Sequence, residues 1–354
     1  MGTARDRRDQ ARQFLADGQD PSHQRKEQKL AQSETFEKVA REWLELQSKK
    51  LSALTIAKAR WILEKHVYPH LGARPIGDIK APDLLGVLRK IEAHGIHQTA
   101  HRTKQRVGQI LRYAIATGRA ERDVSVDLRG ALAPIVTKNH AAITEPTRMG
   151  ELLCAIDRYV GQPVTHAALK LSPLVFVRPG ELRHAEWSEI DFANAEWRIP
   201  GEKMKMRTPH LVPLARQAIE ILRELQPLSR AGRYVFPCRR PGQGPMAANT
   251  INRALRWLGY PRDQMTAHGF RAMASTALNE QGWHPDLIEL QLAHAERNSV
   301  RAAYNRATRA AERRAMMQAW ADYLDVLRRQ GGPSMKAGAG VTETFLLVDA
   351  AAYE

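Results

Sequence analysis

The stretch QLAHAERNSVRAAYNR, residues 291–306, places one tyrosine among several cations. Tyr304 follows His294 by ten residues, and Arg297, Arg301 and Arg306 are among the arginines that lie within seven residues of it. A tyrosine in such a place can pack against its own helix, contact DNA with its ring, or attack an anionic group as a nucleophile. The choice between these interpretations depends on what the rest of the chain places around it.

The overall charge indicates a polyanionic partner. Lys and Arg number 54 against 38 Asp and Glu, which gives a net charge of +16 on 354 residues. This balance favours nucleic acid over other partners. Two distant cysteines, Cys154 and Cys238, provide neither a disulfide framework nor metal-ligand spacing, and they suit a reducing cytoplasm. No apolar run approaches the roughly 20 residues of a membrane span, so we expect no membrane partner.

The first third of the chain predicts a helical DNA-binding domain over residues 33–119. Phe36, Val39, Trp43 and Leu44 follow helical spacing, and Thr35 is suited to cap that helix. The same pattern predicts further helices over 55–68, ending before a proline at 69, from 82 onwards, and up to a glycine at 118. Residues 1–32 predict a basic helix that is too short for a core of its own.

The last helix of this domain has a basic face. Residues 99–119 contain no Asp or Glu, and the face carries Arg102, Lys104, Arg106 and Arg112. Such a face can be merely solvated, but the bias in sign favours contact with DNA. Residues 120–146 then show weak periodicity and two prolines, which predicts a linker with Lys138 in its basic middle.

Residues 147–328 predict a second domain that is mostly helical. Three short apolar runs, 190–192, 197–199 and 211–214, are separated by turn-forming residues and predict a small antiparallel sheet. Helices are expected over 215–226, 248–259, 267–281, 285–293 and 298–328, and residues 329–354 read as a loosely held tail. The predicted fold class is therefore mostly α (α+β), with two domains.

This second domain contains groups suited to chemistry on a phosphodiester. Its acids are scattered, which argues against a site with two metals held by clustered carboxylates. Guanidinium groups can neutralise phosphate instead, and an activated side chain can attack it. Arg178 follows an apolar helix, His268 and Arg271 lie at the start of another, and His294 precedes Tyr304. Each of these residues alone is commonplace, so the ordered set carries the signal.

Five stretches extend that set: RPGELRHAEWSEIDF, IPGEKMKMRTPHLVPL, TAHGFRAMASTALNE, LAHAERNSVRAAYNRA and RRAMMQAWADYLD. In this order they resemble the tyrosine recombinases, or phage-type integrases, and more narrowly prophage integrases of the P4 type. The resemblance covers roughly residues 4–328. It implies a helical core-binding domain followed by a catalytic domain that cuts and rejoins DNA.

The resemblance also implies a clamp for the scissile phosphate. Arg178 and Arg271 would hold the phosphate, and His294 would bind one of its oxygens. Glu181 matches the acidic position after the first arginine, where it would orient neighbouring basic groups. No metal and no cofactor are implied.

The remaining roles concern proton transfer and attack. Tyr304 would be the nucleophile that forms a 3′-phosphotyrosyl ester, and His268 would give acid–base or hydrogen-bonding support. Lys205 would protonate the leaving 5′ oxygen, with Lys203 as the alternative two residues earlier. These roles answer the opening question in favour of a nucleophile beside cations.

The resemblance implies partners as well. These are double-stranded DNA attachment sites, a homotetramer on DNA, a DNA-bending host factor and an excisionase, all at the nucleoid of a bacterial cytoplasm. Residues 1–32 match only the end of an arm-binding domain, so we expect binding of core half-sites alone. Two alternatives stay open: a type IB topoisomerase that relaxes DNA, and a non-catalytic DNA-binding protein of recombinase descent.

Overall fold

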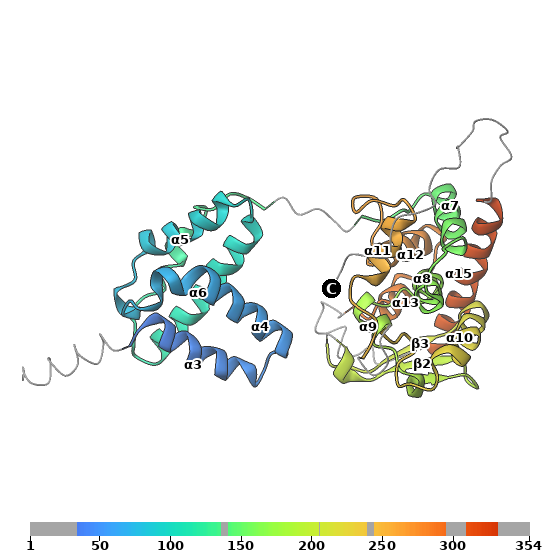
Figure 1. The fold of residues 1–354 in the computed structure, drawn as a ribbon, viewed down its shortest axis with the longest axis horizontal. Coiled ribbons are helices and arrows are strands. Elements are labelled where there is room, and N and C mark those ends of the chain that lie inside the picture. The colour runs from blue at the N-terminus through green and yellow to red at the C-terminus, as the bar shows by residue number, and fades with distance from the viewer. Residues whose placement is uncertain (1–33, 136–140, 205, 239–243, 295–308, 332–354) are drawn as a thin grey trace, which may run out of the picture. The chain divides into compact units, whose positions relative to one another are not determined.

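The computed structural model describes residues 34–135, 141–204, 206–238, 244–294 and 309–331. The chain divides into two compact units, Met1–Thr137 and Lys138–Glu354. Each unit has its own apolar core, and Figure 1 shows their elements. Both units are mainly helical, which confirms the predicted fold class.

The first unit is a bundle of helices. Thr35 caps the first of them by accepting a hydrogen bond from the Lys38 amide, as the sequence predicts. The apolar faces of the long helices form one core that includes Phe36, Leu88 and Leu111. The elements are α3 (Phe36–Ser48), α4 (Ala53–Ile62), η1 (Leu63–Gly72), η2 (Ile76–Asp78), α5 (Ala81–Ala93), α6 (His97–Ala116) and η3 (Val126–Leu128).

The second predicted helix does not end at Pro69. The chain continues through Pro69 as the π-helical stretch η1, up to Gly72. Val67 and Leu71 on either side of the proline are buried in the core. A π-helical turn is wider than an α-helical one, so it can accommodate a residue that cannot donate the usual backbone hydrogen bond. Packing therefore overrides the stop signal that proline gives in the sequence.

The stretch predicted as the start of a linker packs on the first unit instead. Leu128 and Leu132 belong to its core, and the Ala133 amide donates to Glu92 Oε1 over 2.8 Å. Two leucines four residues apart give too weak a period in the sequence to predict this packing. The described part of 120–135 thus belongs to the first unit.

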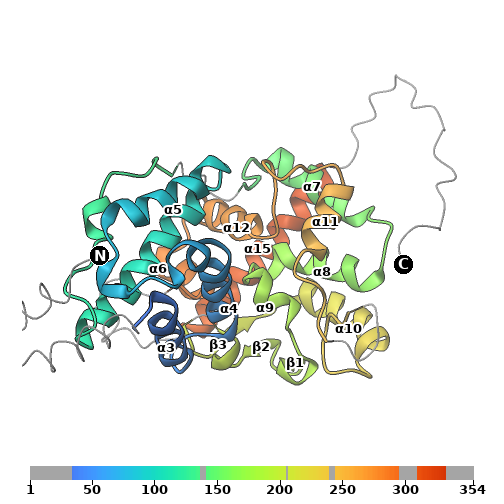
Figure 2. The ribbon, with the colours of Figure 1, turned by 60° about the vertical axis from the view of Figure 1, so that its left-hand side comes forward.

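The second unit is built around helix α8. Helices α7, α10, α11, α12 and α15 all pack against α8, whose Leu169 and Leu174 are buried. Trp320 of α15 donates its indole N–H to the Pro173 carbonyl over 2.9 Å. Figure 2 shows these helices from a second side. Their bounds are α7 (Pro146–Asp157), α8 (Pro163–Val175), α9 (Pro179–Arg183), α10 (Arg216–Ser229), α11 (Thr250–Trp257), α12 (Gly269–Glu280), α13 (Pro285–Gln291) and α15 (Ala310–Gln330).

A small sheet lies at one end of this unit. Its strands are β1 (Ile190–Asp191), β2 (Glu196–Ile199) and β3 (His210–Pro213), in the antiparallel order β1-β2-β3. Trp197 pairs with Ile190 on one side and with Val212 on the other. This confirms the predicted antiparallel sheet. The short helical turns η4 (Trp187–Glu189) and η5 (Gly201–Lys203) flank strands β1 and β2.

The predicted last helix is interrupted at Arg309. Of its predicted range, 298–328, residues 298–308 lie outside the described residues, and α15 begins at Ala310 and ends at Gln330. Arg309 before it has a left-handed backbone (φ 44°), which cannot continue an α-helix. Its side chain pairs with Glu312 in the first turn, and this contact stabilises the new helix start.

No helix within the described ranges is both long enough and apolar enough to cross a membrane.

Candidate active site

Arg178 is placed by a sharp turn after α8. Phe176 ends that helix with a left-handed backbone (φ 35°), and Arg178 then caps α9. The Arg178 amide donates to Glu181 Oε2 over 2.8 Å, and its Nη1 donates to Glu181 Oε1 over 2.7 Å. Nη2 donates to the Ala293 carbonyl over 2.9 Å. Glu181, itself buried, therefore holds both the backbone and the side chain of this arginine.

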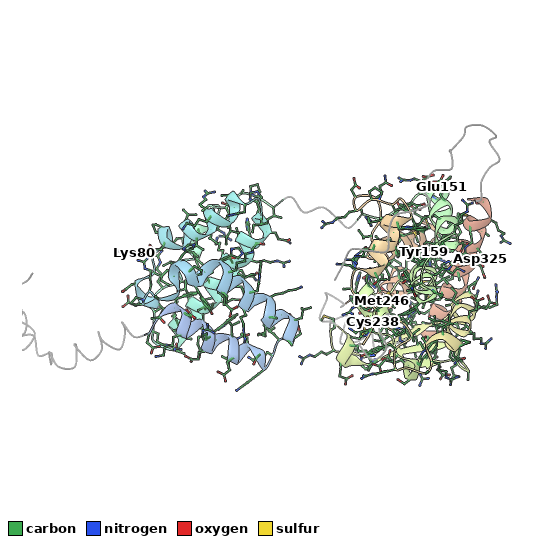
Figure 3. All side chains as sticks on the ribbon, in the orientation of Figure 1. Lys80, Glu151, Tyr159, Cys238, Met246 and Asp325 are labelled. Carbon is green, nitrogen blue, oxygen red and sulfur yellow. The ribbon has the colours of Figure 1, made fainter. Side chains whose placement is uncertain are left out.

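Helix α9 is also fixed from the other side. Arg183 in its last turn donates to the Met246 carbonyl over 3.0 Å. Met246 is buried in the core of this unit, and Figure 3 labels it among the side chains. The short helix that orients Arg178 is thus attached at both of its ends.

Arg271 lies in the first turn of α12 and is only 4% exposed. Its Nη1 donates to the Phe176 carbonyl over 2.9 Å and its Nη2 to the Leu292 carbonyl over 2.7 Å. Burial, aided by the charge of Arg178, lowers the pKa of Arg271 to about 10. The guanidinium therefore stays charged at neutral pH, and its described hydrogen bonds go to neutral acceptors.

His294 completes the group. Helix α13 ends at Gln291, and Ala293 turns the chain with a left-handed backbone (φ 48°). His294 Nε2 lies 3.2 Å from Arg271 Nη2, and its Nδ1 lies 2.7 Å from Glu289 Oε2. The side chain is 47% exposed, so it can reach a ligand that approaches Arg271 from solvent.

Two left-handed residues share one task in this site. Phe176 and Ala293 follow the ends of α8 and α13, and each offers its carbonyl to one of the two arginines. Residues other than glycine adopt this conformation at a cost, and such strain concentrates at functional sites. The turns thereby aim backbone oxygens at guanidinium groups that come from distant parts of the chain.

His268 is the half-buried N-cap residue of α12, three positions before Arg271. Just before it, the Ala267 amide donates to Asn252 Oδ1 of α11 over 2.9 Å. Just after it, Gly269 allows a close approach, because an added Cβ would lie 2.4 Å from the Ala141 carbonyl. The segment that carries His268 is therefore held on both sides.

Lys203 is already engaged in ion pairs. Its Nζ lies 2.5 Å from Glu186 Oε1, also pairs with Glu189, and donates to the His184 carbonyl over 2.9 Å. Its side chain is 21% exposed. The other predicted residues near this chemistry, Lys205 and Tyr304, lie outside the described residues.

The predicted DNA-binding residues of α6 differ in their surroundings. Arg102 is exposed, whereas Lys104 Nζ donates to the Leu128 carbonyl over 2.7 Å. Arg106 bonds Gln109, and burial lowers its pKa. Arg112 pairs with Asp123 over 2.5 Å. Lys138 lies outside the described residues.

Three buried polar residues beside the site were not predicted. His210 Nε2 lies 3.1 Å from the Gln291 carbonyl, and Arg313 Nη2 donates to Gln291 Oε1 over 2.6 Å. Burial and the nearby Arg313 lower the pKa of His210 to about 3. The spacing of Arg313 with Met316, Met317 and Trp320 follows the apolar face of a helix, and that pattern could have revealed a buried arginine.

Comparisons with known proteins agree with this architecture. Residues 36–131 match the phage integrase central domain, and residues 145–311 match the phage integrase family. The chain is 40% identical to IntB of Escherichia coli strain K12, over 93% of this chain and 87% of that protein. It is 39% identical to the integrase of Enterobacteria phage P4, over 93% of this chain and 79% of the phage protein.

A solved structure is similar in fold. It is a lambda integrase tetramer bound to a Holliday junction, with a TM-score of 0.59 and 17% identity. The match covers 75% of this chain and 79% of the lambda protein. At this identity the likeness bears on the fold alone.

Proposed function

Because this chain belongs to the phage integrase family of tyrosine recombinases, we propose that it cuts and rejoins double-stranded DNA at attachment sites through a phosphotyrosyl ester. One observation carries the proposal. The guanidinium groups of Arg178 and Arg271 bond successive carbonyls of one turn, at Ala293 and Leu292, beside His294. Two cations and a histidine converge there from three separate segments.

This arrangement suits a phosphodiester. A guanidinium has five N–H donors. The contacts described above leave donors on both arginines for phosphoryl oxygens, and the planar group matches the geometry of phosphate. Arg271 is bonded to neutral carbonyls, which position its charge without cancelling it. Arg178 and Arg271 would thus stabilise negative charge that grows in the transition state.

The covalent step follows from this charge. The Tyr304 phenol oxygen would form a bond to phosphorus while the bond from phosphorus to the 5′ oxygen breaks. The phenol proton would leave to a nearby base, for which His268 is the candidate, and Lys205 would protonate the 5′ oxygen. An ordinary tyrosine phenol has a pKa of about 10, and nearby cations would stabilise its ionised form, the phenolate. The ester keeps the energy of the broken bond, so rejoining needs no nucleotide.

Between the two lysines, the ion pairs favour Lys205 as the acid. Lys203 Nζ already pairs with the carboxylates of Glu186 and Glu189, so its ammonium group is committed to partners within the protein. Its contacts to His184 and Glu186, just before η4, and to Glu189 within it support a role in anchoring the chain before Lys205. We therefore assign proton donation to Lys205 and anchoring to Lys203.

The substrate would be DNA at attachment sites, bound by both units. The exposed basic face of α6, with Arg102 in particular, supports contact with the phosphate backbone. Strand exchange between two duplexes calls for a homotetramer, and the similar lambda integrase forms one on a Holliday junction. A DNA-bending host factor and an excisionase at the bacterial nucleoid would complete the reaction, with this chain contacting core half-sites.

The test is covalent trapping without metal. The chain is incubated with a nicked suicide duplex taken from the DNA that flanks its own gene, and adducts are resolved on a denaturing gel. We expect an adduct with the unaltered chain and none with Tyr304→Phe, whose DNA affinity stays near that of the parent. No adduct would support a non-catalytic DNA-binding protein. Relaxation of supercoils without strand exchange would support a topoisomerase.

A further inference from the structure

Arg313 is a buried cation with an unusual set of partners. It lies on the inner face of α15 and is 3% exposed. Its Nη2 donates to the Leu211 carbonyl of β3 over 2.5 Å and to Gln291 Oε1 over 2.6 Å. Burial lowers its pKa to about 10, so it remains charged at neutral pH. Among the residues that the structure describes, no carboxylate pairs with it.

Packing alone does not account for a buried arginine at this position. A charge removed from water without a counter-ion destabilises the fold, and an apolar side chain of similar size often stabilises it. Arg313 lies on a helix face whose other residues, Met316, Met317 and Trp320, are hydrophobic and almost completely buried. Its presence there points to a role that methionine could not perform.

Gln291 connects Arg313 to the arginines of the site. Gln291 is fully buried at the end of α13, and its own carbonyl lies 3.1 Å from His210 Nε2 of β3. The next two carbonyls, of Leu292 and Ala293, accept hydrogen bonds from Arg271 and Arg178. Residue 291 of the turn is therefore held by His210 of β3 and Arg313 of α15, and the carbonyls of residues 292 and 293 hold the two guanidinium groups.

We propose that Arg313, acting through Gln291, is a positioning residue that sets the 291–293 turn and thereby the spacing of Arg178 and Arg271. The inference rests on the proposed function, since a clamp needs a phosphate to hold. β3 follows Lys205 in the chain and α15 follows Tyr304. The contacts of Arg313 thus join the elements that lead from the acid and the nucleophile to the turn that supports the clamp.

The test compares Arg313→Met with Arg314→Met. Methionine keeps the bulk of Arg313 and removes its charge and donors. Arg314 is the neighbouring arginine on α15, half exposed and paired with Glu196. Single-turnover adduct formation is measured at saturating protein on the suicide duplex, together with DNA affinity and thermal melting. We expect Arg313→Met to slow cleavage about tenfold or more, because small misplacements of positioned groups are costly. Arg314→Met should stay within about twofold of the parent.

A second substrate separates positioning from general loss of structure. A methylphosphonate at the scissile position removes a negative charge, so the clamp has less charge to neutralise. If Arg313 acts through the clamp, the ratio of parent to Arg313→Met rates should shrink on this substrate. Equal ratios on both substrates, or an unaltered rate on the phosphodiester, would overturn the inference while leaving the proposed function intact.

A variant that keeps Arg313 covers the case in which Arg313→Met does not fold. Gln291→Met retains the volume of the side chain and removes the acceptor for Arg313 Nη2. The amide N–H donors that it also removes have no hydrogen-bond partner among the described residues. The inference predicts the same two results for it: slower cleavage on the phosphodiester and a smaller ratio on the methylphosphonate. Parent-like cleavage by Gln291→Met would count against it. Absence of adducts with the unaltered chain would instead overturn the proposed function itself.

Discussion

Arg271 and Arg112 are held in opposite ways. Arg271 is 4% exposed and bonds the carbonyls of Phe176 and Leu292. The Arg112 side chain is 57% exposed and pairs with Asp123. A carbonyl fixes a guanidinium while leaving its charge uncancelled, whereas a carboxylate cancels much of it. The second unit thus holds a buried guanidinium in a fixed position without a counter-ion among the described residues, as the proposed binding of one phosphate requires, whereas the Arg112 guanidinium on α6 is exposed and shared with a carboxylate.

Arg178 stands between these two cases. It shares one carboxylate, Glu181, and one carbonyl, that of Ala293. Glu181 also accepts from the Arg178 amide, so it orients the residue as well as pairing with it. We therefore expect the orientation of the Arg178 guanidinium to depend on Glu181.

The largest expected effect tests the contrast directly. Arg271→Ala removes a fixed donor to transition-state charge, and we expect cleavage to slow by about 10²–10³-fold. DNA affinity should change little, because many contacts share it. Single-turnover adduct formation and a binding titration measure the two quantities. Arg216→Ala, an exposed arginine paired with Glu220, is the matched control. Equal losses in both variants would remove the distinction between fixed and solvated arginines.

The two lysines of the β2–β3 connection sharpen the same comparison. Lys205→Ala should lose a general acid, which costs about 10²-fold or more in rate. A substrate with a 5′-bridging sulfur has a better leaving group, so it should restore cleavage by this variant. Lys203→Ala should instead lower stability, because the buried carboxylates of Glu186 and Glu189 lose a shared ion-pair partner. Rescue of Lys203→Ala by the sulfur substrate would transfer the acid role to Lys203.

The free energy of unfolding of the second unit, which contains His210, should fall at acid pH. Burial and Arg313 lower the pKa of His210 to about 3 from an ordinary 6.5. Between these two pH values the unfolded chain binds a proton on His210 and the folded chain does not. Stability from this group is complete above pH 6.5 and is lost as the pH falls towards 3. The loss amounts to about 1.4 kcal/mol per pH unit.

The check is thermal melting over that pH range. His210→Gln keeps a polar side chain that does not titrate, so its melting temperature should depend less steeply on pH between 6.5 and 4 than that of the parent. Melting curves with the same slope against pH in both proteins would show that other groups carry the acid sensitivity.

The sequence predicted most of the fold and only part of the site. Helical spacing predicted α3 and α10, and the short apolar runs predicted the sheet, because burial imposes those periods directly. The continuation through Pro69 and the break at Arg309 were missed, since tertiary packing and a local ion pair decide them. Motif order identified Arg178, Arg271 and His294, which the structure brings together.

What motif order could not supply is the support behind those residues. The carbonyls of Phe176 and Ala293 carry no side-chain signature, because any residue has a backbone oxygen. The helical spacing of Arg313 indicates that it is buried, but neither that spacing nor the strand pattern around His210 predicts which groups these two side chains contact. Such contacts depend on three-dimensional packing and become visible only there.

The smallest expected effect concerns α6, the other side of the comparison. Arg102 is exposed on this helix. It forms no ion pair with the described residues, so it can bind a phosphate without breaking one. Arg102→Ala should weaken DNA binding and reduce the slope of log affinity against log salt by about 1. Cleavage at saturating protein should stay near the parent rate, because the clamp is untouched.

Arg112→Ala on the same helix sets the limit of that argument. Arg112 already pairs with Asp123, so its contact with phosphate would have to compete with a carboxylate. We therefore expect the salt slope to change by less than in Arg102→Ala, when both are measured by titration over the same range of salt. A change in slope as large as that of Arg102→Ala would mean that the pair with Asp123 opens on DNA. The division between cations committed to the protein and cations available to phosphate would then fail on α6, and only the buried arginines of the catalytic unit would keep a fixed set of partners.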